Sequence, residues 1–407
     1  MFLWKNSREG FLQYALRTFA SQYDVPAIES FPKAPASLEG FGEHFTGAVC
    51  AGIAPYLCHN GRGSRRMHFA RMPSAAAPVS GLCRAEIYRN PMSAGPDFET
   101  IRAAYARIAP HVHRTPVFTC ARLDERAGAK LFFKCENLQK AGSFKIRGAT
   151  NAVFSLTPEE AARGVVTHSS GNHAAALALA AQLRGIPAWI VIPSNAPRVK
   201  REAVETYGGR ITECEPTLAS REARAREIQQ RTGANLIHPY NDLRVIAGQA
   251  TAALEFLEDA PDLDVILAPV SGGGLLSGTA IAAKSLRPVI RVIGAEPRNA
   301  DDAYRSLASG RLAPAAKTQT IADGLRATLC KLTLQILRER VDEIALVREE
   351  EIIAAMRVVW EQMKLVIEPS AAVPVAPALG RGLHAEGKKV GIILSGGNVD
   401  LARLPFS

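Results

Sequence analysis

The stretch Ser143-Phe144-Lys145-Ile146-Arg147-Gly148 joins two segments of different periodicity, and it decides the predicted fold. Before it, residues 131–135 form a short apolar run of the kind found in buried strands. After it, apolar residues recur at helical spacing from Ala149 to Leu156. Lys145 is therefore expected near a strand-to-helix turn, which is where open α/β folds bind their ligands.

The position of Lys145 suggests a catalytic role for its amine. A lysine half buried at such a turn loses hydration, so its pKa falls and its neutral amine becomes a nucleophile or a Schiff-base former. Most lysines, however, are solvated surface groups, and a lone lysine at a helix start usually has no catalytic role. The other motifs of the chain must decide between these two interpretations.

Strand-length apolar runs alternate with helical runs from Asp97 to the C-terminus. This alternation predicts an α/β fold with open, mostly parallel twisted sheets and helices on both faces. The expected strands are residues 165–168, 188–192, 210–214, 235–238, 265–270, 291–295, 344–347 and 390–394. The expected helices are residues 172–184, 198–207, 220–231, 245–258, 275–286 and 349–364.

The composition is that of a soluble globular protein with a sizeable core. Of the 407 residues, 47% are hydrophobic and 22% are charged, and no apolar run is long enough to span a membrane. The formal charge of +10 comes without a basic stripe interleaved with aromatic residues, which favours anionic small molecules over nucleic acid as partners. The seven cysteines are odd in number and lack metal-ligand spacing, so we expect reduced thiols and a cytoplasmic location.

Residues 1–91 differ from the rest, because Gly, Ala, Pro, Ser and Arg dominate and apolar periodicity is short-lived. This composition predicts an N-terminal extension without a fold of its own. Regular patterning begins soon after Met92, so the first interpretation of residues 1–91 is an untranslated leader that has been read as protein. A disordered extension ranks second. A targeting peptide ranks third, because acidic residues such as Glu9 and Asp24 interrupt the segment.

A glycine-rich loop, Ser271-Gly272-Gly273-Gly274-Leu275, follows the expected strand at 265–270 and opens a helix. Glycines let backbone N–H groups approach a phosphate closely, and the helix N-terminus adds partial positive charge. A turn that only needs a flexible backbone is the plainer explanation. Gly272, Gly274 and Gly278 also mimic a dinucleotide fingerprint, but the last gap is four residues where the fingerprint has three.

Three other segments are candidates for binding. The segment Ser169-Ser170-Gly171-Asn172-His173 follows a strand and starts an alanine-rich helix. Its two interpretations are a plain N-cap and a binding site for a carboxylate. The segment Ser395-Gly396-Gly397-Asn398 ends the final strand. It is interpreted either as a terminal turn or as a ligand contact at the edge of the sheet. The acids within Glu296-Pro297-Arg298-Asn299-Ala300-Asp301-Asp302 suit a solvated helix start or a hard cation.

These motifs occur together, and in this order, in one family. From about Asp97 onward the chain resembles the fold-type-II pyridoxal-phosphate enzymes of the serine racemase and threonine (serine) dehydratase family. The resemblance implies a homodimer of two-lobed subunits, similar in fold to the tryptophan synthase β-subunit. We expect a large cofactor-binding domain in residues 92–163 and 241–407 and a small domain in residues 164–240. Further matching pieces are Ala247-Gly248-Gln249, Ile321-Ala322-Asp323-Gly324 and Glu368-Pro369-Ser370.

The resemblance also implies the residues that bind pyridoxal 5'-phosphate. Lys145 would hold the cofactor as a Schiff base and remove the α-proton of the substrate, while Phe144 would pack beside the ring. Asn172 would hydrogen-bond the phenolic oxygen, and Ser395 would contact the ring nitrogen. The phosphate would be bound by Ser271, Gly272, Gly273, Gly274 and Leu275.

Substrate and metal residues follow from the same resemblance. Ser170 would be a second catalytic residue that returns a proton on the cofactor face opposite Lys145, and Arg221 would lie near the substrate. A structural Mg²⁺, Mn²⁺ or Ca²⁺ would be held by Glu296, the Ala300 carbonyl and Asp302. The substrate carboxylate would be bound by Ser169, Ser170, Asn172 and His173.

Some residues depart from the family pattern. Tyr240 stands where racemases tend to have asparagine, Ala175 stands where glutamine is usual, and Ser271 stands where glycine is more common. Ser170 permits racemisation without requiring it, because bifunctional dehydratases and hydroxyaspartate dehydratases can share this serine. These features concern the choice of substrate and reaction, and not the cofactor.

The sequence therefore predicts a pyridoxal-phosphate-dependent dehydratase, or ammonia-lyase. It would convert L-threonine or L-serine to 2-oxobutyrate or pyruvate and ammonia by β-elimination. The alternatives within the family are a serine racemase, which could be bifunctional, and a hydroxyaspartate or hydroxyectoine-pathway dehydratase. From other classes come a nicotinamide-dependent dehydrogenase and a non-catalytic ligand-binding relative, which would normally have lost the lysine.

Overall fold

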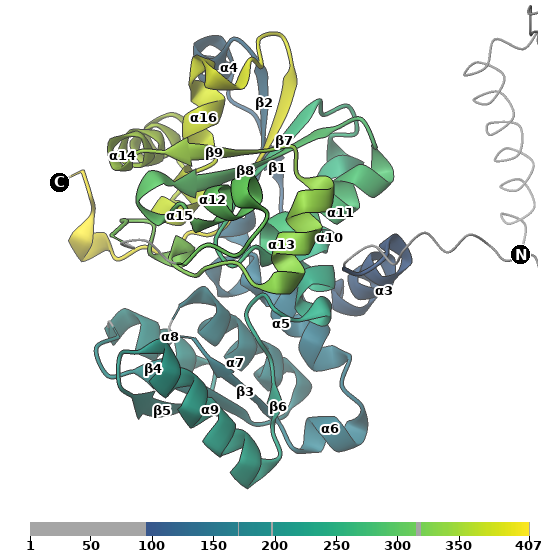
Figure 1. Cartoon of the computed structure of the whole chain (residues 1–407), viewed down its shortest axis with the longest axis vertical. Coiled ribbons are helices and arrows are strands. Elements are labelled where there is room, and N and C mark those ends of the chain that lie inside the picture. Colours follow the sequence, from purple (N-terminus) through teal and green to yellow (C-terminus); the bar gives the residue numbers. More distant parts are fainter. Residues whose placement is uncertain (1–94, 170, 197, 315–318, 407) are drawn as a thin grey trace, which may run out of the picture. The chain divides into compact units, whose positions relative to one another are not determined.

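Two separate sheets organise residues 95–169, 171–196, 198–314 and 319–406, which are the residues that the computed structural model describes (Figure 1). This arrangement confirms the two-lobed α/β fold that the sequence predicted. No helix in the described part of the chain is long and apolar enough to cross a membrane. The cysteines within it, at positions 120, 135, 214 and 330, are free.

The larger sheet has six strands in the order β1-β2-β10-β7-β8-β9. All neighbours are parallel except β1, which pairs antiparallel with β2. The central strand β7 is buried along its whole length, which explains its continuous apolar run. The strands are β1 (Val117–Phe118), β2 (Lys130–Lys134), β10 (Lys389–Ile393), β7 (Val265–Pro269), β8 (Arg291–Pro297) and β9 (Glu343–Val347).

The smaller sheet has four parallel strands in the order β5-β4-β3-β6. They are β5 (Arg210–Cys214), β4 (Ala188–Pro193), β3 (Val165–His168) and β6 (Asn235–Leu236). The sequence predicted that the last strand would continue to residue 238, but β6 ends at Leu236 and the chain turns back toward the larger sheet. Pro239, which lacks an N–H group for a strand ladder, lies in this crossover.

Helices surround both sheets (Figure 1). They are α3 (Phe98–Ile108), α4 (Ala121–Ala127), α5 (Lys145–Phe154), α6 (Pro158–Ala162), α7 (Asn172–Arg184), α8 (Arg198–Thr206), α9 (Leu218–Thr232), α10 (Leu243–Asp259), α11 (Gly274–Leu286), α12 (Asp302–Ser309), α13 (Lys331–Arg340), α14 (Glu349–Val358), α15 (Pro369–Ala372) and α16 (Val375–Leu379). The sequence predicted one helix over residues 349–364. Instead, α14 ends at Val358 and a π-helical turn (Val359–Met363) follows, from which the Trp360 indole donates to the Ile367 carbonyl at 3.1 Å.

Helix α5 connects the two lobes, because it packs against α10 on one side and α7 on the other. Glycines allow the close approach to α10. A Cβ at Gly148 would lie 2.4 Å from Nε2 of Gln249, and a Cβ at Gly248 would lie 2.6 Å from the Arg147 carbonyl oxygen. The Gly148 N–H also donates to Oε1 of Gln249 at 3.1 Å. The glycine of the opening motif is therefore needed for helix packing.

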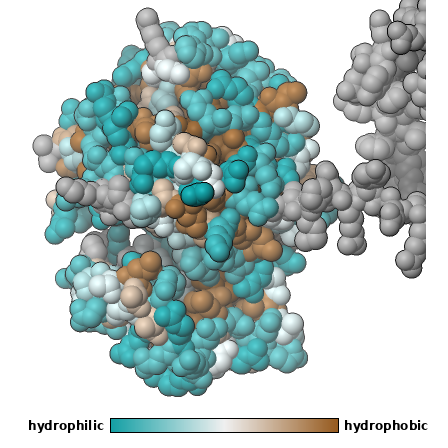
Figure 2. All heavy atoms as spheres, viewed as in Figure 1, coloured by the Kyte–Doolittle hydropathy of each residue, from teal (hydrophilic) through white to brown (hydrophobic). Residues whose placement is uncertain are grey.

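The apolar core forms separate clusters around the sheets. Two large clusters contain residues of the six-stranded sheet, and a third contains buried residues of α5, α7 and the small sheet. Hydrophilic residues cover most of the face seen in Figure 2, and apolar residues appear there in small groups between them. The core thus supports both lobes and fixes the strand ends at which the predicted site lies.

Candidate active site

Lys145 is the first residue of α5, as its sequence context predicted. Its amine is partly buried, donates to the Pro239 carbonyl at 3.2 Å and lies 5.1 Å from the ring centroid of Phe144. Burial lowers the pKa of this amine to about 8, although the nearby Glu368 carboxylate acts in the opposite direction. A lysine in this state has an appreciable neutral fraction near pH 7, as a nucleophile requires.

The lysine segment is joined to the loop after the last strand. The Phe144 N–H donates to the Ser395 carbonyl at 3.1 Å, and the Gly397 N–H donates to the Gly142 carbonyl at 2.9 Å. Ser143 pairs with Gly396 as an isolated antiparallel bridge. Ser395 is buried, so its side chain is shielded from solvent. Ser143 and Gly396, which belong to two motifs far apart in the sequence, are thereby brought together.

Asn172, the first residue of α7, contacts the opposite lobe through both ends of its amide. Its Nδ2 donates to the two carboxylate oxygens of Glu368 at 2.9 and 3.1 Å, and its Oδ1 accepts from Asn398 at 3.0 Å. Glu368 is buried, and burial raises its pKa to about 7 against the effect of the Asn172 hydrogen bonds. Glu368 belongs to the Glu368-Pro369-Ser370 motif, for which the sequence predicts no role. An acid before a helix-starting proline is an ordinary sequence feature, so only the contact with Asn172 reveals it.

The crossover segment, residues 237–241, runs past the lysine. His173 Nε2 lies 3.2 Å from the Ile237 carbonyl, and the ring of His238 accepts the N–H groups of Tyr240 and Asn241 at Nδ1, at 3.3 and 2.9 Å. Burial is the main cause that lowers the pKa of His173 to about 3 and that of His238 to about 4. Both imidazoles are therefore neutral near pH 7, and they add no positive charge beside Lys145.

The glycine-rich loop connects β7 to α11, as predicted. Gly273 has a φ of 89°, which favours glycine, and Leu275 is buried in the first turn of α11. The Ser271 hydroxyl is 3.1 Å from both the carbonyl oxygen and the N–H of Ala327, so it fastens the loop to a neighbouring segment. The loop presents a helix N-terminus beside the crossover segment, and this arrangement suits an anion.

The predicted substrate residues are partly accounted for. Ser169 accepts the Gly171 N–H at 3.4 Å and lies just before α7, whereas Ser170 lies outside the described residues. Arg221 is in the first turn of α9. Its Nε is buried, and its guanidinium has no hydrogen bond or ion pair with any described residue. Burial lowers the pKa of His168 at the end of β3, Glu222 raises it, and the positive charge of Arg221 lowers it further.

Glu296 and Asp302 are buried at the end of β8 and the start of α12, with the buried Ala300 between them. Glu296 accepts the N–H groups of Ala303 and Tyr304, each at 2.9 Å, and Asp302 accepts that of Leu329 at 3.1 Å. Burial raises the pKa of Glu296 to about 8 and that of Asp302 to about 6. Among the described residues there is no cluster of three or more His, Cys, Asp or Glu side chains, so the predicted set depends on two carboxylates and a carbonyl.

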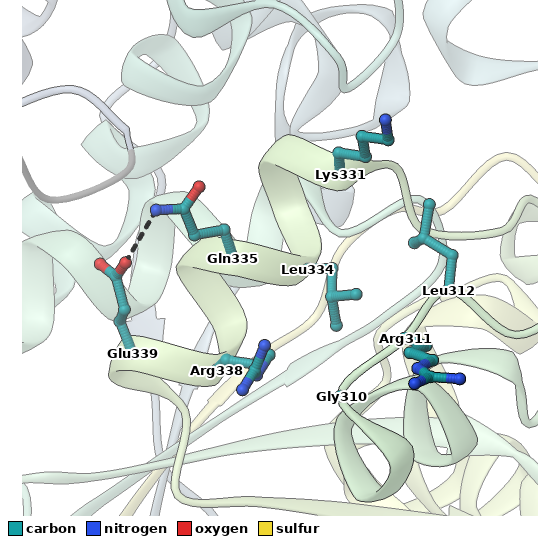
Figure 3. Close-up of a pocket in the computed structure, with 8 residues that line it drawn as sticks. All are labelled: Gly310, Arg311, Leu312, Lys331, Leu334, Gln335, Arg338 and Glu339. Atoms are coloured by element: carbon teal, nitrogen blue, oxygen red, sulfur yellow. Dashed lines mark hydrogen bonds between the residues drawn. The ribbon is translucent and has the colours of Figure 1, made fainter.

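A surface groove lies elsewhere on the large lobe, between α13 and the turn after α12 (Figure 3). It contains none of the residues that the sequence predicted for the site. Its lining residues are Gly310, Arg311, Leu312, Lys331, Leu334, Gln335, Arg338 and Glu339.

Known proteins share this organisation. The family model described as pyridoxal-phosphate dependent enzyme matches residues 108–396. Serine racemase of Oryza sativa subsp. indica is 52% identical over 313 residues, which are 76% of this chain and 92% of the relative. The beta-hydroxyaspartate dehydratase of Paracoccus denitrificans (strain Pd 1222) is 50% identical over 312 residues, which are 77% of this chain and 99% of the relative. The structure of maize serine racemase superposes with a TM-score of 0.75 and 52% identity, covering 76% of this chain and 95% of that one.

A lysine at the start of a helix, a glycine-rich loop after a buried parallel strand and a two-lobed α/β fold together are the arrangement of a fold-type-II pyridoxal-phosphate enzyme. The chain belongs to this class, and within it to the serine racemase and threonine dehydratase family. The family match includes the Gly272–Gly274 run, which therefore belongs to a pyridoxal-phosphate enzyme and not to a nicotinamide-binding domain. The dimer and the cytoplasmic location stay predictions.

The described residues fit the cofactor that the family implies. Gly272 and Gly274 place backbone without side chains at a helix start, where N–H groups bind phosphate. Lys145 supplies an amine of lowered pKa, and the buried Ser143 hydroxyl beside it has no partner among the described residues. These features meet the needs of an aldehyde with an attached phosphate.

Proposed function

We propose that this chain is a pyridoxal-phosphate-dependent serine racemase that also catalyses β-elimination from L-serine. The observation that carries the proposal is the partly buried Lys145 amine, which donates to the Pro239 carbonyl, next to the Tyr240 ring that packs on the glycine-rich loop. The similarity to serine racemases over nearly their full length favours racemisation over the dehydratase reaction that the sequence first suggested.

The proposed catalytic residues act on opposite sides of the substrate. Lys145 would take the α-proton, and Ser170 would supply a proton from the opposite side. The start of α7, with Ser169, Asn172 and His173, would bind the substrate carboxylate through N–H groups and side chains. The bound cofactor supplies an electron sink that acidifies the α-carbon. When the β-hydroxyl departs as water after loss of the α-proton, hydrolysis of the remaining enamine gives a 2-oxo acid and ammonia.

The cofactor contacts are proposed as the sequence predicted them. Residues 271–275 would hold the phosphate, Phe144 would cover one side of the ring, and Ser395 would face the ring nitrogen. Asn172 would reach the phenolic oxygen with the same amide that Glu368 and Asn398 orient. Glu296, Ala300 and Asp302 would hold a structural divalent cation, because their buried oxygens suit a hard ion whose charge would relieve the repulsion between the two acids.

A second candidate is a hydroxyaspartate dehydratase. Arg221 favours it, since a guanidinium with no partner among the described residues could bind the second carboxylate of such a substrate. The 50% identity to the Paracoccus beta-hydroxyaspartate dehydratase supports the same candidate.

A substrate panel tests these proposals. The full chain, saturated with pyridoxal phosphate, is incubated with L-serine, L-threonine and 3-hydroxyaspartate, and chiral chromatography is combined with detection of 2-oxo acids. We expect D-serine and pyruvate from L-serine, and we expect Lys145→Ala to reduce both at least about 100-fold, the lower range for loss of an acid–base group. Pyruvate without D-serine would reject the racemase. A preference for 3-hydroxyaspartate that Arg221→Lys abolishes would establish the second candidate.

A further inference from the structure

Tyr240 occupies the space beside the glycine-rich loop where side chains at Gly272 and Gly274 would otherwise be. A Cβ at Gly272 would lie 2.3 Å from Cδ1 and 2.4 Å from Cε1 of the Tyr240 ring. A Cβ at Gly274 would lie 3.0 Å from Cβ of the same residue. The ring therefore packs directly on Gly272, which cannot gain a side chain without displacing it, and the Cβ of Tyr240 limits the space at Gly274.

The opposite side of the loop is also packed. A Cβ at Gly273 would lie 2.8 Å from Cβ of Thr333 and 2.9 Å from Cδ2 of Leu329. The loop is thus held between Tyr240 of the crossover segment on one side and, on the other, Thr333 in the first turn of α13 and Leu329 just before that helix. Because backbone N–H groups bind a phosphate only if they converge on it, both packing surfaces determine the geometry of the phosphate cradle.

Tyr240 itself is held in place from the small lobe. The Nδ1 atom of His238 accepts the Tyr240 N–H at 3.3 Å, and the two rings meet edge to face with centroids 4.6 Å apart. The His238 ring in turn meets His168, at the end of β3, with centroids 5.5 Å apart. The tyrosine ring is therefore part of a line of rings that begins at the small sheet, and it is not a loosely placed surface side chain.

The neighbouring residue contacts the lysine. The Pro239 carbonyl accepts from Lys145 Nζ at 3.2 Å, so one dipeptide touches both the amine and the phosphate loop. A cofactor that binds covalently at one end and through a phosphate at the other needs a fixed distance between these two points. Residues 239 and 240 span that distance.

We propose that Tyr240 is a positioning residue for the cofactor phosphate: its ring forms the wall that sets the conformation of the glycine-rich loop. This inference rests on the proposed binding of pyridoxal phosphate by residues 271–275. It assigns the hydroxyl no part, because the contact with the loop is made by ring carbons. Removal of the ring should weaken binding of the cofactor's phosphate and leave the reaction of its aldehyde with Lys145 unchanged.

The test compares two ligands that differ only in the phosphate. Dissociation constants of pyridoxal phosphate and of pyridoxal are measured by the visible absorbance of the full-length chain, for wild type, Tyr240→Phe and Tyr240→Ala. We expect Tyr240→Ala to weaken pyridoxal phosphate binding about tenfold, which corresponds to about 1.4 kcal/mol, and to change pyridoxal binding less than about twofold. Tyr240→Phe should match wild type with both ligands. Phe118→Ala, at an exposed phenylalanine of β1, is the control for loss of a ring elsewhere.

A second variant approaches the same contact from the loop and keeps the test valid if Tyr240→Ala does not fold. Gly272→Ala should weaken binding of pyridoxal phosphate but not of pyridoxal, because its methyl group would collide with the ring. Equal losses for both ligands, or no loss for either, would overturn the positioning role. A wild-type chain that binds no pyridoxal phosphate would overturn the proposed function as well. If the wild-type chain binds pyridoxal phosphate and the ratio of the two dissociation constants is the same in both variants as in wild type, this inference alone would be overturned.

Discussion

At the scale of single residues, the state of Lys145 leads to a prediction about pH. Burial lowers the pKa of its amine from 10.5 to about 8, which raises the neutral fraction at pH 7 about 300-fold. The rate at which the cofactor-free chain forms a Schiff base with added pyridoxal phosphate should therefore rise with pH up to about 8 and then level off. Stopped-flow absorbance across pH 6 to 10 measures this profile, and Lys145→Ala should lack the reaction.

Glu368 provides the control for this profile, because a nearby carboxylate stabilises the ammonium form and so raises the pKa of Lys145. Glu368→Gln removes that charge, so the midpoint of the rate profile should move to lower pH. A midpoint that stays in place would show that Glu368 does not act on the lysine. An upward shift would contradict the sign of the interaction.

At the scale of elements, the placement of α5 depends on a buried charge network. The Arg147 guanidinium donates to Glu136 through Nε and Nη2, each at 2.8 Å, and to Glu255 of α10 through Nη1 at 2.8 Å and Nη2 at 2.7 Å. Lys134 of β2 donates to the same Glu255 at 2.7 Å. All four side chains are buried, and two positive charges balance two negative ones. The buried part of the network is therefore neutral, and it fixes the helix two residues after the lysine.

Arg147→Met should destabilise the chain by about 3–5 kcal/mol, because it leaves buried carboxylates without their partner. Urea unfolding followed by circular dichroism measures the loss. Arg291→Met removes one member of an exposed pair with Glu343 and should cost less than about 1 kcal/mol. Similar costs for the two variants would show that the buried network contributes no more than a surface ion pair.

The sequence predicts the elements of this protein better than their contacts. Apolar periodicity and caps mark β3 and α7 to the residue, and the alternation of strands and helices indicates parallel sheets. Arg147 was quoted in the opening motif, but its partners are 11 and 108 residues away, and no local pattern identifies them. The same holds for Asn172 with Glu368 and for Tyr240 with Gly272. Periodicity reports which face of an element is buried, whereas the site depends on which elements meet.

At the scale of the whole molecule, the distribution of the core makes a prediction about the N-terminal segment. The four core clusters contain buried residues from Ile101 to Leu394, and they include both sheets and the helices around them. The rice and maize serine racemases align with 76% of this chain while 92% and 95% of their own lengths are covered. A chain that starts at Met92 therefore holds all the residues of these clusters and all the site residues proposed above.

We expect the chain of residues 92–407 to fold and to bind pyridoxal phosphate as the full chain does. Its melting temperature should agree with that of the full chain within about 2 °C, since a difference of 1 kcal/mol shifts the melting temperature of a domain larger than 150 residues by about 2–4 °C. Differential scanning calorimetry and cofactor absorbance check the two properties on matched samples. A clearly lower melting temperature, or loss of the cofactor, would show that residues 1–91 contribute to the folded enzyme. Equal values would show that the scaffold that carries Lys145, the glycine-rich loop and Tyr240 is stable without residues 1–91.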